Sequence, residues 1–139
     1  MDGTSARDFG VGDVIDFIRG NDRRGTCFGR WPNNILSPFI SFSADIGSLH
    51  LVQKDGELVA VGFARQIDED DLDRHWLPQK REGTAIEFQD VLSKNKQGLE
   101  TLIDEFTSRH PDWREKKLFA TRHGQRKRIQ PELIERLMA

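Results

Sequence analysis

Two β-prone runs separated by a short polar turn constrain the fold of this chain most strongly. Residues 48–53 (SLHLVQ) and 58–64 (LVAVGFA) flank residues 54–57 (KDGE). Asp-Gly between such runs is typical of a two-residue hairpin turn, because both central residues of that turn need a positive φ. The sequence therefore predicts an antiparallel β-hairpin over residues 48–64.

Helical and extended patterns alternate along the rest of the chain. Apolar residues share one helical face in residues 13–18. In residues 99–106, leucine, isoleucine and phenylalanine fall at i, i+3, i+4 and i+7, which is typical of a core-facing helix. The other expected elements are a short helix or turn over residues 35–42, strands over 84–88 and 117–122, and a closing helix over 131–138. We therefore expect an α+β (α/β) fold with a mixed β-sheet.

The composition is typical of a soluble, folded domain. Lys and Arg number 21 against 23 Asp and Glu, and 9 Phe with 3 Trp supply bulk for a core. We expect residues 1–139 to form one domain, with residues 1–10 loose. No apolar run approaches the roughly 18 residues of a membrane helix, and the N-terminus lacks the apolar stretch of a signal peptide, so we expect a cytoplasmic protein. The net charge of -2 argues against a protein built around nucleic-acid backbone binding.

The sequence offers little support for metal or disulfide chemistry. The single cysteine, Cys27, excludes an intrachain disulfide and a Cys-rich zinc site, and the four histidines lack the spacing of a zinc motif. The acidic run at residues 68–73 lacks the spacing of a calcium loop, so we interpret it as a solvated surface segment. We expect no metal and no tightly bound cofactor.

The turn between the third expected strand and the helix that follows it is a candidate ligand site. The first amides of a helix lack intrahelical partners and carry partial positive charge, so they bind phosphate or pyrophosphate. Gly98 would let a ligand approach the backbone, and two lysines would add positive charge. The alternative is an ordinary strand–turn–helix junction that binds nothing. The candidate donor-binding residues are Lys94, Lys96, Gln97 and Gly98.

Several short segments carry a family resemblance through their order, although none of them is specific by itself. The segments are Gly12–Ile15, Trp31-Pro32, Ile35–Ile40, Leu49–Ala64, Asp90–Leu99 and Lys117–Arg122. Their linear order resembles that of the toxin-activating lysine acyltransferases, a family with a GNAT-type acyltransferase fold. The resemblance implies a GNAT-like mixed sheet with helices on both faces. It also implies transfer of an acyl group from a thioester donor, acyl carrier protein or CoA, to an amine, the side chain of a protein lysine.

The resemblance also suggests catalytic groups. Asp90 matches the family's catalytic carboxylate. The family has a catalytic histidine in the loop just before Trp-Pro, whereas residues 26–30 contain none. Cys27 lies close to that place and could act as a thiolate nucleophile; the alternative is a buried neutral thiol. His75, after the acidic run, is a further candidate base from a loop. Residues 93–98 keep only the last glycine of the loop with which other GNAT enzymes bind acetyl-CoA.

A basic cluster near the C-terminus is the candidate partner-binding surface. It consists of Arg122, Arg126, Lys127 and Arg128. We expect these residues to contact an acidic partner such as acyl carrier protein, with a merely solvated hairpin tip as the alternative. Nucleic acid is the least expected partner, because no aromatic residue interleaves these charges for base stacking.

The sequence thus leaves two functions open. The first is an acyltransferase that acts on a protein acceptor. The second is a catalytically inactive protein that reuses the same scaffold, for example a phage virion component that self-associates or binds a host protein. The missing histidine and the shortened glycine loop favour the second.

Overall fold

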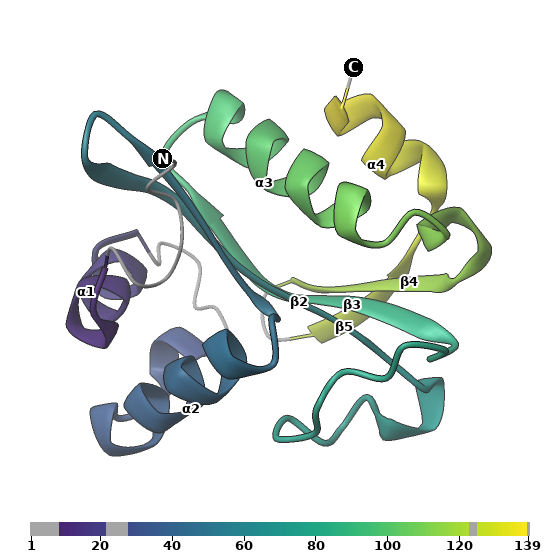
Figure 1. Ribbon diagram of the computed structural model, residues 1–139, viewed down its shortest axis with the longest axis horizontal. Helices are drawn as coiled ribbons and strands as arrows, with labels where there is room; N and C mark the ends of the chain where they lie inside the picture. Colours follow the sequence, from purple (N-terminus) through teal and green to yellow (C-terminus); the bar gives the residue numbers. More distant parts are fainter. Residues whose placement is uncertain (1–8, 22–27, 123–124, 139) are drawn as a thin grey trace.

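A mixed β-sheet forms the centre of the chain over the residues that the computed structural model describes, 9–21, 28–122 and 125–138 (Figure 1). Within those ranges the sheet has five strands in the order β1-β2-β3-β4-β5. The strands are β1 (Leu49–Lys54), β2 (Glu57–Ile67), β3 (Ala85–Ser93), β4 (Lys117–Arg122) and β5 (Gln125–Ile129). Neighbouring strands are antiparallel except β3 and β4, which are parallel. The predicted mixed sheet is confirmed.

Helices cover both faces of this sheet (Figure 1), so the predicted α+β architecture is also confirmed. One face carries α1 (Val11–Asn21) and α2 (Asn33–Asp45), and the other carries α3 (Lys96–Arg109) and α4 (Pro131–Met138). Short 3-10 helices occur at η2 (Phe28–Arg30), η3 (Glu69–Asp71) and η4 (Trp113–Glu115). The buried aromatic side chains are Phe17, Phe28, Phe39 and Phe63 on the α1–α2 side, and Phe88, Phe106 and Trp113 on the α3–α4 side.

The β1–β2 hairpin forms as the sequence predicts. Asp55 and Gly56 have φ angles of 55° and 81°, the conformation that a two-residue hairpin turn needs. Leu49 and Leu51 join the core under α1 and α2, whereas His50 faces the other way and contacts Phe106 of α3. This alternation is typical of a strand with both faces covered.

Three elements differ from the sequence-based expectation. The third expected strand, residues 84–88, is the longer β3, which runs to Ser93 and therefore includes Asp90. Residues 35–42 were expected to form a short helix or turn, yet α2 is a full helix that contains Pro38. The proline removes a hydrogen bond to the carbonyl of Asn34, which is exposed in the first turn, so water can replace it. Residues 125–129 contain part of the basic cluster, for which no strand is expected. In the structure they form the edge strand β5. Their sequence, QRKRI, carries little β-propensity, and charged side chains are typical of sheet edges.

No helix in the described ranges is both long and apolar enough to cross a lipid bilayer.

Candidate active site

The parallel strands β3 and β4 are paired only over their first residues. Their pairing runs from Ala85 with Lys117 to Phe88 with Ala120. Beyond that point β3 continues to the end of its range without a strand partner on the β4 side. On its other side β3 carries a bulge: Phe63 pairs with Asp90 and Ala64 pairs with Phe88, so Gln89 is the extra residue. Because a bulge bends its strand, β3 turns away from β4 there.

Asp90, the predicted catalytic carboxylate, lies immediately after the bulge. It is 4% exposed, and its Oδ2 accepts a hydrogen bond from the backbone N–H of Phe28 at 2.6 Å. Phe28 begins η2, the short segment before Trp31 and Pro32. Asp90 therefore fixes the Trp-Pro segment against β3, which brings together two features that the resemblance implied. Its role in catalysis stays a prediction, and Cys27 lies outside the described residues.

A histidine lies beside Trp31, although none precedes it in the sequence. The ring of His75 is edge-on to Trp31, with ring centroids 5.6 Å apart, and edge-on to Phe28 at 5.9 Å. It comes from the long connection between β2 and β3, which lies on the same side of the sheet as α2 (Figure 1). The Nδ1 atom of His75 is buried and has no hydrogen-bond partner in the described structure. Within the described residues, no protein group therefore engages this nitrogen.

The surroundings of His75 favour its neutral form. Burial is the largest cause, followed by the positive charge of Arg65, and together they lower the pKa of His75 below its ordinary value of 6.5. Arg126 acts in the same direction, and the carboxylates of Glu87 and Asp73 oppose it without reversing the shift. A neutral imidazole at pH 7 can accept a proton, which is what a general base must do.

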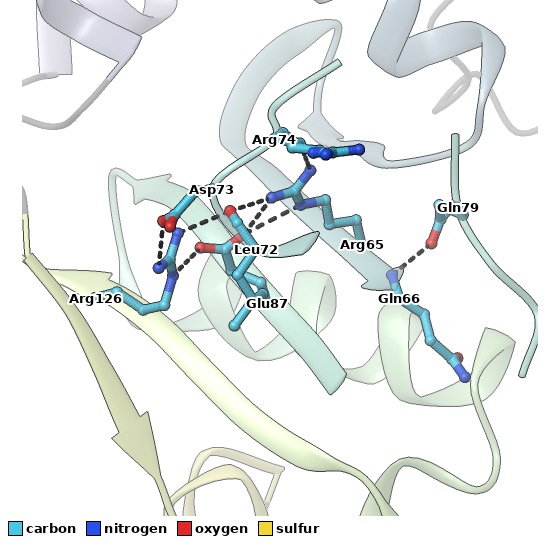
Figure 2. A network of polar contacts seen from close by, with 8 residues as sticks. All are labelled: Arg65, Gln66, Leu72, Asp73, Arg74, Gln79, Glu87 and Arg126. Carbon is cyan, nitrogen blue, oxygen red and sulfur yellow. Dashed lines mark hydrogen bonds and ion pairs between the residues drawn. The ribbon is translucent and has the colours of Figure 1, made fainter. Parts of the chain in front are cut away.

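Two arginines hold the segment that ends at His75 against the sheet (Figure 2). Arg65, on β2, is 1% exposed; its Nη2 donates to the carbonyl of Leu72 at 2.7 Å and its Nη1 donates to the carbonyl of Arg74. Arg126, on β5, donates from Nη2 to the same Leu72 carbonyl at 2.8 Å. Because these carbonyls belong to the residues just before His75, the two guanidiniums determine where that imidazole lies.

Glu87 lies between the two guanidiniums and forms an ion pair with each of them (Figure 2). Its Oε1 is 2.9 Å from Nη2 of Arg65 and accepts from Nε at 3.1 Å, while its Oε2 accepts from Nε of Arg126 at 2.9 Å. Asp73 accepts from Nη1 of Arg126 at 3.0 Å. Buried charges need such partners, because an unpaired ion loses its hydration without compensation. The members of this network are far apart in the chain, so their contacts depend on the tertiary fold.

The predicted donor-binding turn is partly closed by its own side chains. Asn95 caps α3: its Oδ1 accepts from the amide of Gly98 at 2.7 Å. A Cβ atom at Gly98 would lie 2.7 Å from Oγ of Ser93 and 3.3 Å from the carbonyl of Val59. The glycine therefore allows close packing within the chain at this point. Donor binding by this turn stays a prediction.

The structure separates the four predicted donor-binding residues. Gln97 and Gly98 line a cavity of about 240 Å³ between the start of α3 and the β1–β2 hairpin. Lys94 instead places its Nζ 5.8 Å from the ring centroid of Phe17, on the α1 side. Lys96 forms a loose ion pair with Glu100 at 3.8 Å on α3. The two lysines do not line this cavity.

The predicted partner surface is likewise divided. Arg126 forms an ion pair with Glu87 at 2.9 Å, so its charge is already engaged within the chain. Lys127 is exposed on β5, and the guanidinium of Arg128 lies 5.8 Å from the ring centroid of Phe119. Arg122 ends β4. Lys127 and Arg128 are therefore the residues of the cluster that we expect to contact an acidic partner. That contact stays a prediction.

No group of three or more His, Cys, Asp or Glu side chains in the described ranges could hold a metal ion. A second cavity, of about 640 Å³, lies at the far end of α3, where Nδ1 of His110 is 2.8 Å from Oε1 of Gln66. It contains none of the residues that the sequence singled out as site residues.

We expect the protein to lose stability as the pH falls below 6.5. Burial lowers the pKa of both His75 and His110, so the unfolded chain binds more protons than the folded one in this range. The free energy of unfolding should be level above pH 7 and decrease towards pH 5. Urea denaturation at several pH values checks this. His75→Asn should make the decrease shallower, and an unchanged slope would contradict the shift.

No protein family and no curated protein matches this chain. Solved structures do match. The GphF GNAT-like decarboxylase, solved in complex with isobutyryl-CoA, matches 79% of this chain and 60% of its own, with a TM-score of 0.50 and 12% identity. The fold is of the GNAT type. The loading GNATL domain of CurA from Lyngbya majuscula matches 81% of this chain and 61% of its own, with a TM-score of 0.49 and 12% identity.

The GNAT-type likeness concerns the fold. The chain spans about three fifths of the length of the two solved structures, and at 12% identity no residue role is carried over. The GNAT-type fold that the resemblance implied is confirmed. Membership of the toxin-activating family stays a hypothesis, because no family model and no curated protein matches the chain.

Proposed function

We propose that the protein transfers an acyl group from a thioester, of CoA or of acyl carrier protein, to an amine. The observation that carries the proposal is His75, a half-buried neutral imidazole with an unpartnered Nδ1, held beside Trp31 on the α2 side of the sheet. The diverging ends of β3 and β4 supply the second part of the site, because the backbone of β3 beyond Phe88 has no strand partner on the β4 side.

The proposed reaction needs a base and a donor of hydrogen bonds. The lone pair of the amine nitrogen attacks the thioester carbonyl carbon, a C–N bond forms, and the C–S bond breaks. His75 accepts the proton that the nitrogen loses and returns it to the departing sulfur, so the products are an amide and a thiol. In this proposal, backbone N–H groups of β3 after the bulge stabilise the oxyanion. Asp90 holds the Phe28–Trp31 segment against which His75 packs.

The donor class is suggested by a solved structure of the same fold, and the acceptor class by the family resemblance. A solved neighbour of the same fold holds isobutyryl-CoA, which makes acyl-CoA the first donor to test, and acyl carrier protein thioesters the second. A protein lysine as acceptor is implied by the resemblance to the toxin-activating acyltransferases. Exposed Lys127 would suit an acidic carrier protein.

The test is an acyl-transfer assay with the full chain. The protein is incubated with isobutyryl-CoA, acetyl-CoA or an acyl carrier protein thioester, together with lysine-containing peptides, and the products are followed by mass spectrometry. We expect acylated peptide and free thiol. A Cys27→Ser variant separates direct attack, which it leaves intact, from an acyl-cysteine intermediate, which it abolishes. If no donor gives thiol, acyl peptide or acyl protein, the acyltransferase proposal is wrong.

A second candidate is a GNAT-fold protein that binds a partner without catalysis. The capped turn at the start of α3 favours it, because Asn95 occupies an amide that a donor phosphate would otherwise contact. This protein would assemble with a partner or with itself, and it would show no turnover with any thioester. Size-exclusion chromatography with light scattering tests self-assembly on the same preparation.

A further inference from the structure

Gln89 is a buried amide without a partner. Its side chain is 3% exposed, and Nε2 makes no hydrogen bond in the described structure. Leaving a buried donor unsatisfied costs the desolvation of that group, so folded proteins contain few of them. Such a group calls for an explanation in this fold.

A comparable buried glutamine elsewhere in the chain has hydrogen-bond partners for its side-chain amide. Gln66, on β2, is also 3% exposed, yet its Nε2 donates to the carbonyls of Arg81 at 3.0 Å and Gly83 at 3.1 Å. Its Oε1 lies 2.8 Å from Nδ1 of His110. Burial of a glutamine is therefore compatible with full hydrogen bonding here, and Gln89 is the exception.

The position of Gln89 suggests what its amide is for. It is the extra residue of the β3 bulge, and it follows Phe88, the last residue of β3 that pairs with β4. The unpartnered amide thus lies where the parallel strands separate. Asp90, the next residue, binds the Phe28 amide on the side of the sheet that carries His75. Gln89 therefore lies between the end of the β3–β4 pairing and Asp90, and Asp90 is connected to His75 through Phe28.

We propose that Nε2 of Gln89 donates a hydrogen bond to a carbonyl oxygen of the bound acyl donor. The acceptor is the thioester carbonyl or an amide carbonyl of the pantetheine arm, the carbonyl groups that CoA and acyl carrier protein thioesters share. This inference rests on the proposed function, and it assigns a donor-binding role to a side chain that the sequence did not single out. Binding of the donor gives this amide the hydrogen-bond acceptor that the described residues do not supply.

The test compares Gln89→Met with Gln66→Met, two substitutions that remove a buried amide at similar volume. Isothermal titration with isobutyryl-CoA measures donor affinity, and urea denaturation measures stability. We expect Gln89→Met to weaken the donor about tenfold and to raise the urea midpoint, because an unsatisfied amide is removed. Gln66→Met should lower the midpoint, because it leaves two carbonyls unpaired, and should keep the donor affinity within about twofold of the wild type.

The outcomes separate this inference from the proposed function. If the wild type binds isobutyryl-CoA and Gln89→Met binds it equally well, the inference is wrong and the proposed function stands. A lower urea midpoint for Gln89→Met, or its failure to fold, also overturns the inference, since it shows that the amide is structural. If the wild type binds neither CoA thioesters nor acyl carrier protein thioesters, the proposed function and the inference fail together.

Discussion

Replacing Glu87 with alanine is expected to lower the free energy of unfolding by about 3–5 kcal/mol, the usual cost of removing one partner of a buried ion pair. The side chains of Glu87 and Arg65 are 2% and 1% exposed, so the variant leaves a guanidinium buried without its counter-ion. Arg126 loses its hydrogen bond to the same carboxylate. Urea denaturation measures the change. Small domains are stable by only about 5–15 kcal/mol, so the effect is large.

The ion pair of Arg114 with Glu135 provides the matched control. It has a similar N–O distance of 2.9 Å but lies on the surface. Glu135→Ala should therefore change the free energy of unfolding by less than about 1 kcal/mol. The double variant Arg65→Met with Glu87→Leu should recover much of the loss, because it removes both buried charges. A Glu87→Ala variant no less stable than Glu135→Ala would refute the role given to the network.

His75→Asn is expected to reduce kcat/KM for acyl transfer by about 10²–10⁴-fold, the usual contribution of a general base. Asparagine keeps a polar side chain but cannot accept the proton. The wild-type rate should be constant above pH 7 and fall as the pH drops, because protonation of His75, whose pKa is below 6.5, removes the base. Steady-state assays from pH 5 to pH 8 check both expectations.

His110→Asn is the matched control for that variant. Burial lowers the pKa of His110 as it does that of His75, but His110 lies at the end of α3, next to Gln66. Its replacement should leave kcat/KM within a few-fold of the wild type. Equal losses in the two variants would show that the effect comes from the fold, and an unimpaired His75→Asn variant would remove His75 from the mechanism.

Local patterns predicted most of the secondary structure. The Asp55-Gly56 pair located the hairpin, and the stripe from Leu99 to Phe106 located α3, because both depend on residues close in sequence. β4 and α4 were predicted with their observed bounds. The bulge at Gln89 and the strand β5 were not predicted, since a bulge depends on the register with β2 and an exposed edge strand on its pairing with β4.

The site was less accessible to sequence reasoning. Asp90 was found through the resemblance, and His75 was named only as a further loop base, because its contact with Trp31 depends on how the β2–β3 connection folds back. One weak sequence signal pointed to the network that positions His75: an arginine within the otherwise largely apolar β2. A buried Arg65 must find carbonyl and carboxylate partners. Those partners are the residues that place His75.

The central claim is that an acyl thioester binds where β3 and β4 diverge, and amide NMR during titration with isobutyryl-CoA tests it most directly. We predict saturable shifts for residues 89–92 of β3 and for Thr121 at the end of β4. Thr101 and Lys54, which line the cavity at the start of α3, should shift less. Saturating donor that leaves residues 89–92 unmoved would contradict the account.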